Sequence, residues 1–394
     1  MPQLPPMRWP PRTDRPGKPA DGPVPYCFGM PRRTATMLAS TLLLIAVLCA
    51  AVLIKVPYSA MSPGPTYNTL GSVDGEQVLS FPGEEVSDNK ASGHLNMTTV
   101  RVTGSDYRMN LFRAIYGWLA EDSAVVPRQT LYPSGKSAEE VKEQNAEEFS
   151  RSQESAKVAA LRELGEKVPT RVVVQAVLKD GEARGKLHAG DVIKSVDGTR
   201  VKDPNDVAEL VTEHDPGEKV RFTVVPADKA EAAEKDGRNP EKLPGERVTV
   251  PTRKADDGRA VVGIQPGVAH TLPISIDITL ADVGGPSAGL MFALGIVDKL
   301  TPEDLTDGSF VAGTGTIDDK GQVGPIGGIH MKTVAAREKG AEFFLTPKDN
   351  CTGAVANAPD GLILVKIDTM DDAMSALRKI KADKTAELPR CAAG

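Results

Sequence analysis

Residues 282–294 read DVGGPSAGLMFAL, and this stretch decides how the last third of the chain is built. The apolar residues of Ile274–Leu280 predict a strand, the Gly-Gly-Pro triplet predicts a turn, and the apolar run after it predicts a helix. Ser287 then stands at the N-terminal end of this helix, where unpaired N–H groups carry partial positive charge. This position suits both a nucleophilic serine and a simple N-cap.

Two residues downstream are candidate bases for Ser287. Gly285-x-Ser287-x-Gly289 matches a nucleophile elbow, but only His330 follows it and too few strands remain for that fold. Lys332 lies 45 residues after Ser287, early in a helix that follows the turn GPIGG at 324–328. A lysine that is partly buried at such a place loses basicity and can accept the serine proton. An isolated lysine is usually a solvated surface cation, so the argument depends on the pairing of the two motifs.

Together, these two motifs resemble the proteolytic domain of Lon-type Ser/Lys peptidases. Further matching segments are VAGTGTI at 311–317, FFLTP at 343–347 with Asn350, LNMTTV at 95–100 and SQESAK at 152–157. The resemblance implies Ser287 as nucleophile and Lys332 as general base and acid. It implies support for the oxyanion at Gly285, Pro286 and Ala288, and a threonine beside the lysine. That threonine is either Thr314 or Thr316, and the family's acidic residue is displaced here to Asp282.

A second resemblance covers residues 165–252. A strand from Arg171, the segment LHAGDVI at 187–193 and an Asp197-Gly198 turn resemble a PDZ domain of the circularly permuted bacterial type. PDZ domains add an extended peptide as a strand beside a helix. We expect this groove between 171–176 and 206–211, lined by Val172, Val173, Val174, Val207 and Leu210. The usual Gly-Φ-Gly-Φ loop is not visible before the strand, which leaves binding of free C-termini open. Residues 226–246 read as a polar loop.

Ala35–Ile54 carries no charge over 20 residues, which is long enough to cross a bilayer. Residues 1–34 have a net charge of +4, so the positive-inside rule predicts a cytoplasmic N-terminus and an outer position for residues 56–394. A cleaved signal peptide fits less well, because its apolar region is shorter. Cys351 and Cys391 would both lie outside and can either pair or stay free, and Cys27 and Cys49 cannot join them.

Composition excludes several classes of protein. The 394 residues carry a net charge of −6 and only 4% aromatic residues, which argues against a nucleic-acid binder. The five histidines are scattered without metal-ligand spacing. We therefore expect no metal, no cofactor and no nucleic-acid partner. Gly135-Lys136-Ser137 is not a P-loop, because position 130 is Thr, so this chain has no ATP site of its own.

The sequence thus predicts an α+β protein with one N-terminal transmembrane helix, a Lon-type α/β proteolytic domain and an inserted, β-rich PDZ-like domain. The expected parts are a disordered basic cytoplasmic tail at 1–34, the membrane helix at 35–55, the first part of the Lon-like domain at 60–164, the PDZ-like domain at 165–252, the Lon-like part with the dyad at 259–385, and a tail at 386–394. Further α-helices are expected at 110–120, 139–164 and 206–214.

The resemblance is closest to the membrane-anchored PDZ–Lon proteins of Gram-positive bacteria. It implies a single-pass serine endopeptidase of the cell membrane that cleaves extracytoplasmic proteins or peptides without ATP, with the PDZ-like domain recognising substrates. A hexameric homo-oligomer is implied only by the rings of Lon. Two alternatives stay open: a non-catalytic PDZ-bearing membrane scaffold with a degenerate Lon-like domain, and a protease driven by a separate partner ATPase.

Overall fold

The computed structural model describes residues 32–84, 92–120, 122–133, 135–235, 238–280, 283–384 and 387–392. Most of the predicted N-terminal tail, part of the predicted C-terminal tail and Asp282 lie outside these residues. The chain divides into two compact units, one holding its first 55 residues with Asn110–Phe112 and the other holding the rest.

Helix α1 (Arg32–Leu53) confirms the helix expected at Ala35–Ile54. It buries none of its residues, and it is long and apolar enough to cross a membrane. A helix with apolar side chains on all sides needs an apolar surrounding to be stable, because no polar stripe is available to face water.

The first large sheet has six strands in the order β20-β19-β16-β5-β1-β6. Its strands are β1 (Tyr58–Asn68), β5 (His94–Val102), β6 (Ala124–Pro127), β16 (Phe310–Gly313), β19 (Phe343–Pro347) and β20 (Ile363–Ile367). Strands β5, β16, β19 and β20 are parallel, whereas β1 runs antiparallel to both β5 and β6. Val311 is paired with Leu95, so segments far apart in sequence share this sheet.

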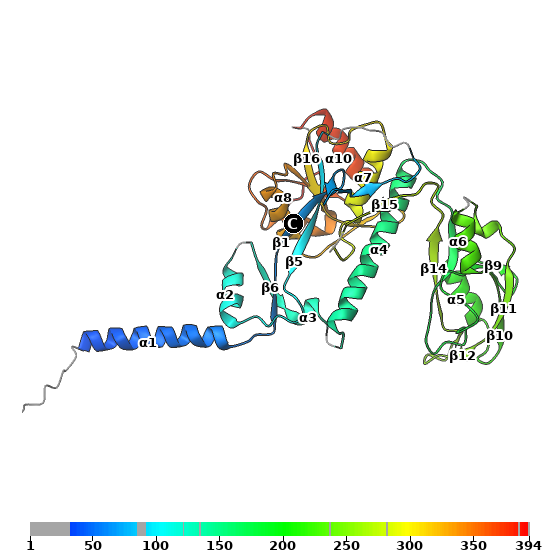
Figure 1. Ribbon diagram of the computed structural model, residues 1–394, viewed down its shortest axis with the longest axis horizontal. Coiled ribbons are helices and arrows are strands. Elements are labelled where there is room, and N and C mark those ends of the chain that lie inside the picture. The colour runs from blue at the N-terminus through cyan, green and yellow to red at the C-terminus, as the bar shows by residue number, and fades with distance from the viewer. Residues whose placement is uncertain are drawn as a thin grey trace, which may run out of the picture. The chain divides into compact units, whose positions relative to one another are not determined.

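Helices cover both faces of this sheet, which is visible around β16 in Figure 1. On one face pack α4 (Ala138–Glu163), α7 (Gly289–Leu300) and α10 (Met370–Ala382), and on the other α8 (Ile329–Glu338) and α9 (Cys351–Val355). Side chains alternate along a strand, so Phe343 and Leu345 join the first core and Phe344 joins the second. The helix expected at 139–164 is confirmed as α4, and the one expected at 110–120 as α2 (Leu111–Leu119).

Short elements complete this part of the chain. They are β2 (Ser72–Val73), β3 (Glu76–Gln77), β4 (Leu79–Ser80), α3 (Arg128–Leu131), β15 (Asp277–Ile278), β17 (Thr316–Ile317), β18 (Val323–Gly324) and the 3-10 helix Lys348–Asn350. The strand predicted at Ile274–Leu280 is thus much shorter than expected, because only two of its residues pair, with Leu79 and Ser80 of β4.

The second large sheet forms the PDZ-like part, with the order β11-β10-β8-β7-β14 and β9 beside β8. Its strands are β7 (Thr170–Val177), β8 (Val192–Val196), β9 (Thr199–Arg200), β10 (Lys219–Val225), β11 (Glu246–Pro251) and β14 (Ile264–His270). A short hairpin of β12 (Arg253–Lys254) and β13 (Ala260–Val261) precedes β14. Helix α5 (Pro204–Thr212) confirms the helix expected at 206–214, and the side chain of Asp203 caps its N-terminus.

The polar loop predicted at 226–246 is wrong, because it contains α6 (Ala227–Lys235) and a 3-10 turn at Pro240–Lys242. Ala230 of α6 packs in a small core with Val173, Val192 and Val225. Alanine buries little apolar surface, so this helix lacks the apolar stripe that identifies an amphipathic helix in a sequence.

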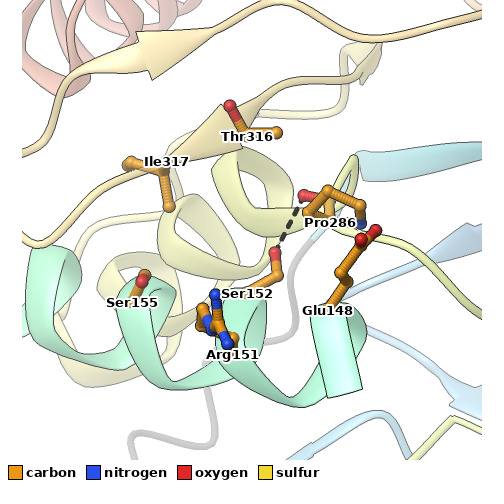
Figure 2. A pocket seen from close by; sticks show the side chains of 7 residues that line it. All are labelled: Glu148, Arg151, Ser152, Ser155, Pro286, Thr316 and Ile317. Carbon is orange, nitrogen blue, oxygen red and sulfur yellow. Dashed lines mark hydrogen bonds between the residues drawn. The ribbon is translucent and has the colours of Figure 1, made fainter. Parts of the chain in front are cut away.

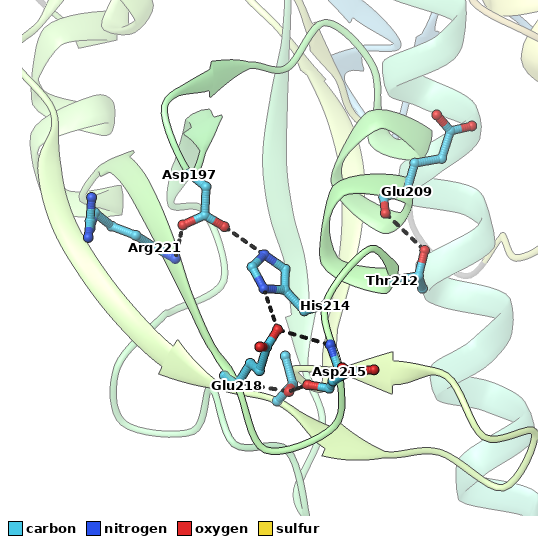
Figure 3. A network of polar contacts seen from close by, with 8 residues as sticks. Asp197, Glu209, Thr212, His214, Asp215, Glu218 and Arg221 are labelled. Carbon is cyan, nitrogen blue, oxygen red and sulfur yellow. Dashed lines mark hydrogen bonds and ion pairs between the residues drawn. The ribbon is translucent and has the colours of Figure 1, made fainter.

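Two turns of the PDZ-like part are held by side chains. Asp197 and Gly198 both have positive φ and join β8 to β9, which confirms the predicted tight turn. His214 connects this turn to a neighbouring one, with Nε2 at 2.9 Å from Asp197 and Nδ1 at 3.2 Å from Glu218 (Figure 3). Asp191 accepts hydrogen bonds from the N–H groups of His188 and Ala227.

Gly289 determines how closely α7 approaches its neighbours. A Cβ atom there would lie 2.8 Å from Ser152 Oγ of α4 and 3.0 Å from Ile317 Cγ2. These separations are shorter than normal contacts, so any side chain at position 289 displaces α4, β17 or both.

We expect Gly289→Ala to lower the free energy of unfolding by about 1–3 kcal/mol, the usual cost of overpacking a well-filled core. Thermal unfolding of the chain in detergent micelles measures this change. Gly104→Ala is the matched control, because a Cβ at Gly104 has no neighbour within 4 Å. Equal stability of the two variants would contradict the packing argument.

Candidate active site

Ser287 and Lys332 meet beside Thr314, the residue that follows the central strand β16. The Lys332 Nζ atom donates hydrogen bonds to Ser287 Oγ at 2.7 Å and to Thr314 Oγ1 at 2.9 Å. Thr314 Oγ1 in turn donates to the backbone oxygen of Ser287 at 2.9 Å. These three side chains therefore form one connected cluster, in which each hydroxyl also fixes the position of the amine.

The Lys332 side chain is buried although it carries an amine. The residue is 2% exposed, and burial lowers the pKa of its amine from 10.5 to about 7. It is the fourth residue of α8, and the positive end of a helix dipole disfavours a cation there in the same direction. A neutral amine at this place accepts a proton from Ser287 Oγ, whereas an ammonium group only donates to it.

The loop that carries Ser287 is held by helix α4. Ser152 Oγ donates to the backbone oxygen of Pro286 at 2.9 Å, a bond drawn in Figure 2. The N–H of Gly285, a residue with φ of +82°, donates to the backbone oxygen of Asn145 at 2.9 Å. Ser287 precedes Ala288, the N-cap residue of α7, and it is therefore not the cap itself.

The turn before Lys332 is held by one asparagine. Asn350 Oδ1 accepts a hydrogen bond from the Ile326 N–H, and Asn350 Nδ2 donates to the Ile326 oxygen, both at 2.9 Å. The side chain of Asn350 thus pairs with both backbone groups of Ile326, as a neighbouring strand would. Sequence reasoning placed Asn350 in a matching motif but assigned it no contact.

A cleft of about 860 Å³ opens at the Ser–Lys pair. Strands β1 and β5, helix α3, the start of α4, residues 283–288 and the turn before α8 line it. This volume lies within the range of roughly 300–1,000 Å³ that ligand sites occupy. Apolar side chains such as Met61, Tyr67 and Met97 form part of its walls, and Ser287 and Lys332 contribute the reactive groups.

Only some of the residues predicted to support the lysine or the oxyanion have contacts that fit this role. Thr314 contacts Lys332, whereas Thr316 lines a separate pocket of about 220 Å³ with Ser152 and Ile317 (Figure 2). The N–H of Gly285 is already bonded to Asn145, and proline has no N–H. Of the three residues proposed to support an oxyanion, this leaves Ala288 with an amide to offer. His330 has its Nδ1 3.2 Å from the Asn357 oxygen and does not line the cleft.

The expected PDZ groove needs a correction. Strand β7 pairs with β8 on one side and along its length with β14 on the other, so its edges are occupied. Val172, Val174 and Val207 lie in the core of the PDZ-like part, with Leu210 at its border, and Val173 belongs to a second core beside α6. Strand β14 is one edge strand of this sheet and β11 is the other, and α5 packs beside β14. The Val-Gly-Ile sequence at 262–264 leads into β14.

Cys351 and Cys391 form a disulfide that joins α9 to the segment after α10, across 40 residues of sequence. Cys49 in α1 is a free cysteine. The sequence left open whether the first two would pair.

A serine hydroxyl bonded to a buried amine in a cleft is the arrangement of a serine hydrolase that uses lysine as its base. Comparison with known families agrees. Residues 264–377 match the model of the Lon protease (S16) C-terminal proteolytic domain, and residues 141–234 match a PDZ domain model. The chain thus carries a PDZ domain and a Lon-type serine peptidase domain.

Curated relatives match this chain over about a quarter of its length. Lon protease of Azospirillum brasilense is 39% identical over 94 residues, which are 23% of this chain and 11% of that protein. Lon protease 2 of Bacillus subtilis is 34% identical over 97 residues, 24% of this chain and 17% of that protein. The chain therefore spans only a small part of these relatives. The PDZ domain of an SdrC-like protein from Listeria innocua is 22% identical, covering 26% of this chain and 98% of that chain with a TM-score of 0.20.

We expect kcat/KM for a soluble protein substrate to rise with pH through about 7 and to level off above it. Lys332 accepts the serine proton only when neutral, and burial sets the pKa of its amine at about 7. The pH–rate profile measures this midpoint. Thr314→Val removes a hydrogen bond acceptor of the ammonium form, so its midpoint should fall below that of the wild type. A midpoint near 10 would contradict a buried base.

Proposed function

We propose that this chain is a membrane-anchored serine endopeptidase in which Ser287 is the nucleophile and Lys332 is the general base and acid. The observation that carries the proposal is the 2.7 Å hydrogen bond between Ser287 Oγ and a lysine amine with a pKa of about 7. The cleft around this pair is large enough for an extended peptide, so protein segments are the proposed substrates.

Each step of the reaction uses groups that are already in place. Neutral Lys332 takes the proton of Ser287 Oγ as this oxygen attacks the peptide carbonyl carbon. The amide of Ala288, at the N-terminus of α7, stabilises the oxyanion that forms. Protonated Lys332 then donates its proton to the leaving nitrogen, which breaks the peptide bond and leaves an ester on Ser287. Lys332 then takes a proton from a water molecule as the water attacks this ester, and it returns a proton to Ser287 Oγ as the carboxylic acid product leaves.

The chemistry needs no nucleotide, because proton transfer and oxyanion stabilisation both come from residues of the cleft. The proposed substrates are unfolded, truncated or membrane-tethered proteins, which can enter the cleft without being unfolded first. Thr314 is a positioning residue in this proposal, since it touches the amine and the Ser287 backbone.

We place the proteolytic and PDZ domains outside the cell membrane, with α1 as a single anchor and the N-terminus in the cytoplasm. The net charge of +4 over residues 1–34 supports this orientation. The disulfide between Cys351 and Cys391 supports it independently, because disulfides persist mainly in oxidising compartments.

The PDZ domain is proposed to hold extended substrate segments along β14, the edge strand beside α5. An unpaired edge strand offers backbone hydrogen bonds to a peptide, and the neighbouring helix supplies apolar side chains such as that of Leu210. The domain boundaries at 165–252 and 259–385 and a homo-oligomer remain proposals from the sequence.

We expect casein cleavage by the purified full chain in detergent, without ATP, and its loss by at least about 10³-fold in Ser287→Ala and in Lys332→Ala, since each removes half of the reacting pair. Ser155→Ala and Lys339→Ala are matched controls outside the cleft and should cleave at the wild-type rate. Product formation on gels and in a fluorescent casein assay gives the rates.

Undiminished cleavage by Ser287→Ala would overturn the assignment of the nucleophile. An inactive wild-type chain whose Ser287 also fails to react with a peptide-like electrophile would favour the non-catalytic scaffold. Cleavage that appears only with an added ATPase would favour the partner-driven protease.

We expect Leu210→Glu to raise KM for casein about tenfold with little change in kcat, because a lost substrate contact away from the reacting atoms weakens uniform binding. Leu178→Glu is the control, since Leu178 is an exposed leucine of the same domain that follows β7. An unchanged KM in Leu210→Glu would argue against substrate binding beside α5.

A further inference from the structure

Helix α2 differs from the usual amphipathic helix of a water-soluble domain, because it exposes its large apolar side chains and buries small residues. The residues it buries are the small ones, Ala114 and Gly117. A Cβ at Gly117 would lie 2.7 Å from Val125 Cγ2 of β6, which shows how closely the helix approaches that strand. Most of the large side chains of the helix, in contrast, are exposed.

The exposed stripe of α2 consists of Ile115, Tyr116 and Leu119, with Trp118 beside it. Tyr116 is 68% exposed and Leu119 is 81% exposed. These residues recur at the spacing of one helical face, and Phe112 continues the same spacing. Exposed large apolar side chains gathered on one element indicate a surface that another apolar phase covers.

Contacts within the chain indicate that the apolar phase covering α2 is a lipid membrane. In the unit that contains α1, the N–H of Leu111, the first residue of α2, donates a hydrogen bond to the backbone oxygen of Ile54 at 3.0 Å. Lys55 and Asn110 also form a β-bridge. Helix α2 therefore begins beside the residue at which the proposed membrane span ends, which is the level of the lipid headgroups.

The composition of α2 also fits that level. Tryptophan and tyrosine are enriched at membrane–water interfaces, where the ring is in an apolar layer and the polar group is hydrated. Trp118 packs edge-on against Tyr58 with ring centroids 5.5 Å apart, and its Nε1 lies 3.3 Å from the Val125 oxygen. Arg108, which precedes the helix, and Arg113, a helix residue that also donates to the Tyr107 hydroxyl, are both exposed, and cations there favour anionic headgroups.

We infer that α2 is an interfacial helix that lies in the outer headgroup layer of the membrane, with Ile115, Tyr116 and Leu119 directed into the lipid. The inference depends on the proposed role of α1 as an anchor but not on the proposed peptidase chemistry. The partner of α2 in this inference is a lipid surface. The test has to distinguish this lipid surface from a second copy of the chain that covers the same helix.

The test uses the fact that the chain has only two tryptophans. In full-length Trp9→Phe, Trp118 is the sole indole. This variant is reconstituted into vesicles of phosphatidylcholine and phosphatidylglycerol whose acyl chains carry bromine either near the headgroup or near the bilayer centre. We expect strong quenching of Trp118 by the shallow bromine, weaker quenching by the deep bromine, and little quenching by aqueous acrylamide.

Two further variants make the result specific. Leu178→Trp in a background of Trp9→Phe and Trp118→Phe reports on an exposed site of the PDZ domain, and we expect acrylamide but not bromolipid to quench it. Tyr116→Asp with Leu119→Asp in the Trp9→Phe chain places charges on the stripe, and we expect it to weaken bromolipid quenching severalfold.

Acrylamide quenching of Trp118 without bromolipid quenching would overturn the inference, because the helix would then be in water. Quenching by neither agent would also overturn it, since a second copy would then cover the helix. Alkaline carbonate extraction tests α1 separately: a chain that resists extraction but shows no bromolipid quenching fails this inference alone. Casein cleavage in detergent is unaffected by either result, so the peptidase proposal is judged independently.

Discussion

The burial of the Lys332 amine beside Ser287 is the constraint on which the rest of the site depends. Removal of water from the ammonium form lowers the pKa of the amine from 10.5 to about 7. At 1.36 kcal/mol per pKa unit, this disfavours the charged form by roughly 5 kcal/mol. The fold tolerates such a group because the Ser287 and Thr314 hydroxyls remain as hydrogen bond partners. Any change that admits water to this amine would return its basicity and leave it protonated at neutral pH.

The site is assembled from chain segments that come before and after the strands of the second large sheet. Helix α4, which precedes β7 of that sheet, holds the loop of Ser287 through Ser152 and Asn145. Strand β5 also precedes β7 and lies in the first sheet between β1 and β16. The matched Lon-type region begins only at residue 264, so it lacks these supports. The core of the PDZ domain is separate from that of the proteolytic sheet. A sheet with its own core can be accommodated between these segments without disturbing the geometry of the serine and the lysine.

Helices and motifs that depend on local patterns could be predicted from the sequence. Features that depend on pairing between distant strands could not. Helix α1 follows from a long apolar run without charge, and α4 and α5 follow from helical patterns in the sequence. The Ser and Lys motifs marked the two residues that the structure joins. Thr314 and Thr316 were indistinguishable because residues two apart share a face of a strand. Strand β16 ends at Gly313, so this alternation no longer applies at Thr314, which alone turns toward the amine. The edge position of β14 was equally hidden, since strand order depends on pairing across the sheet and not on local sequence.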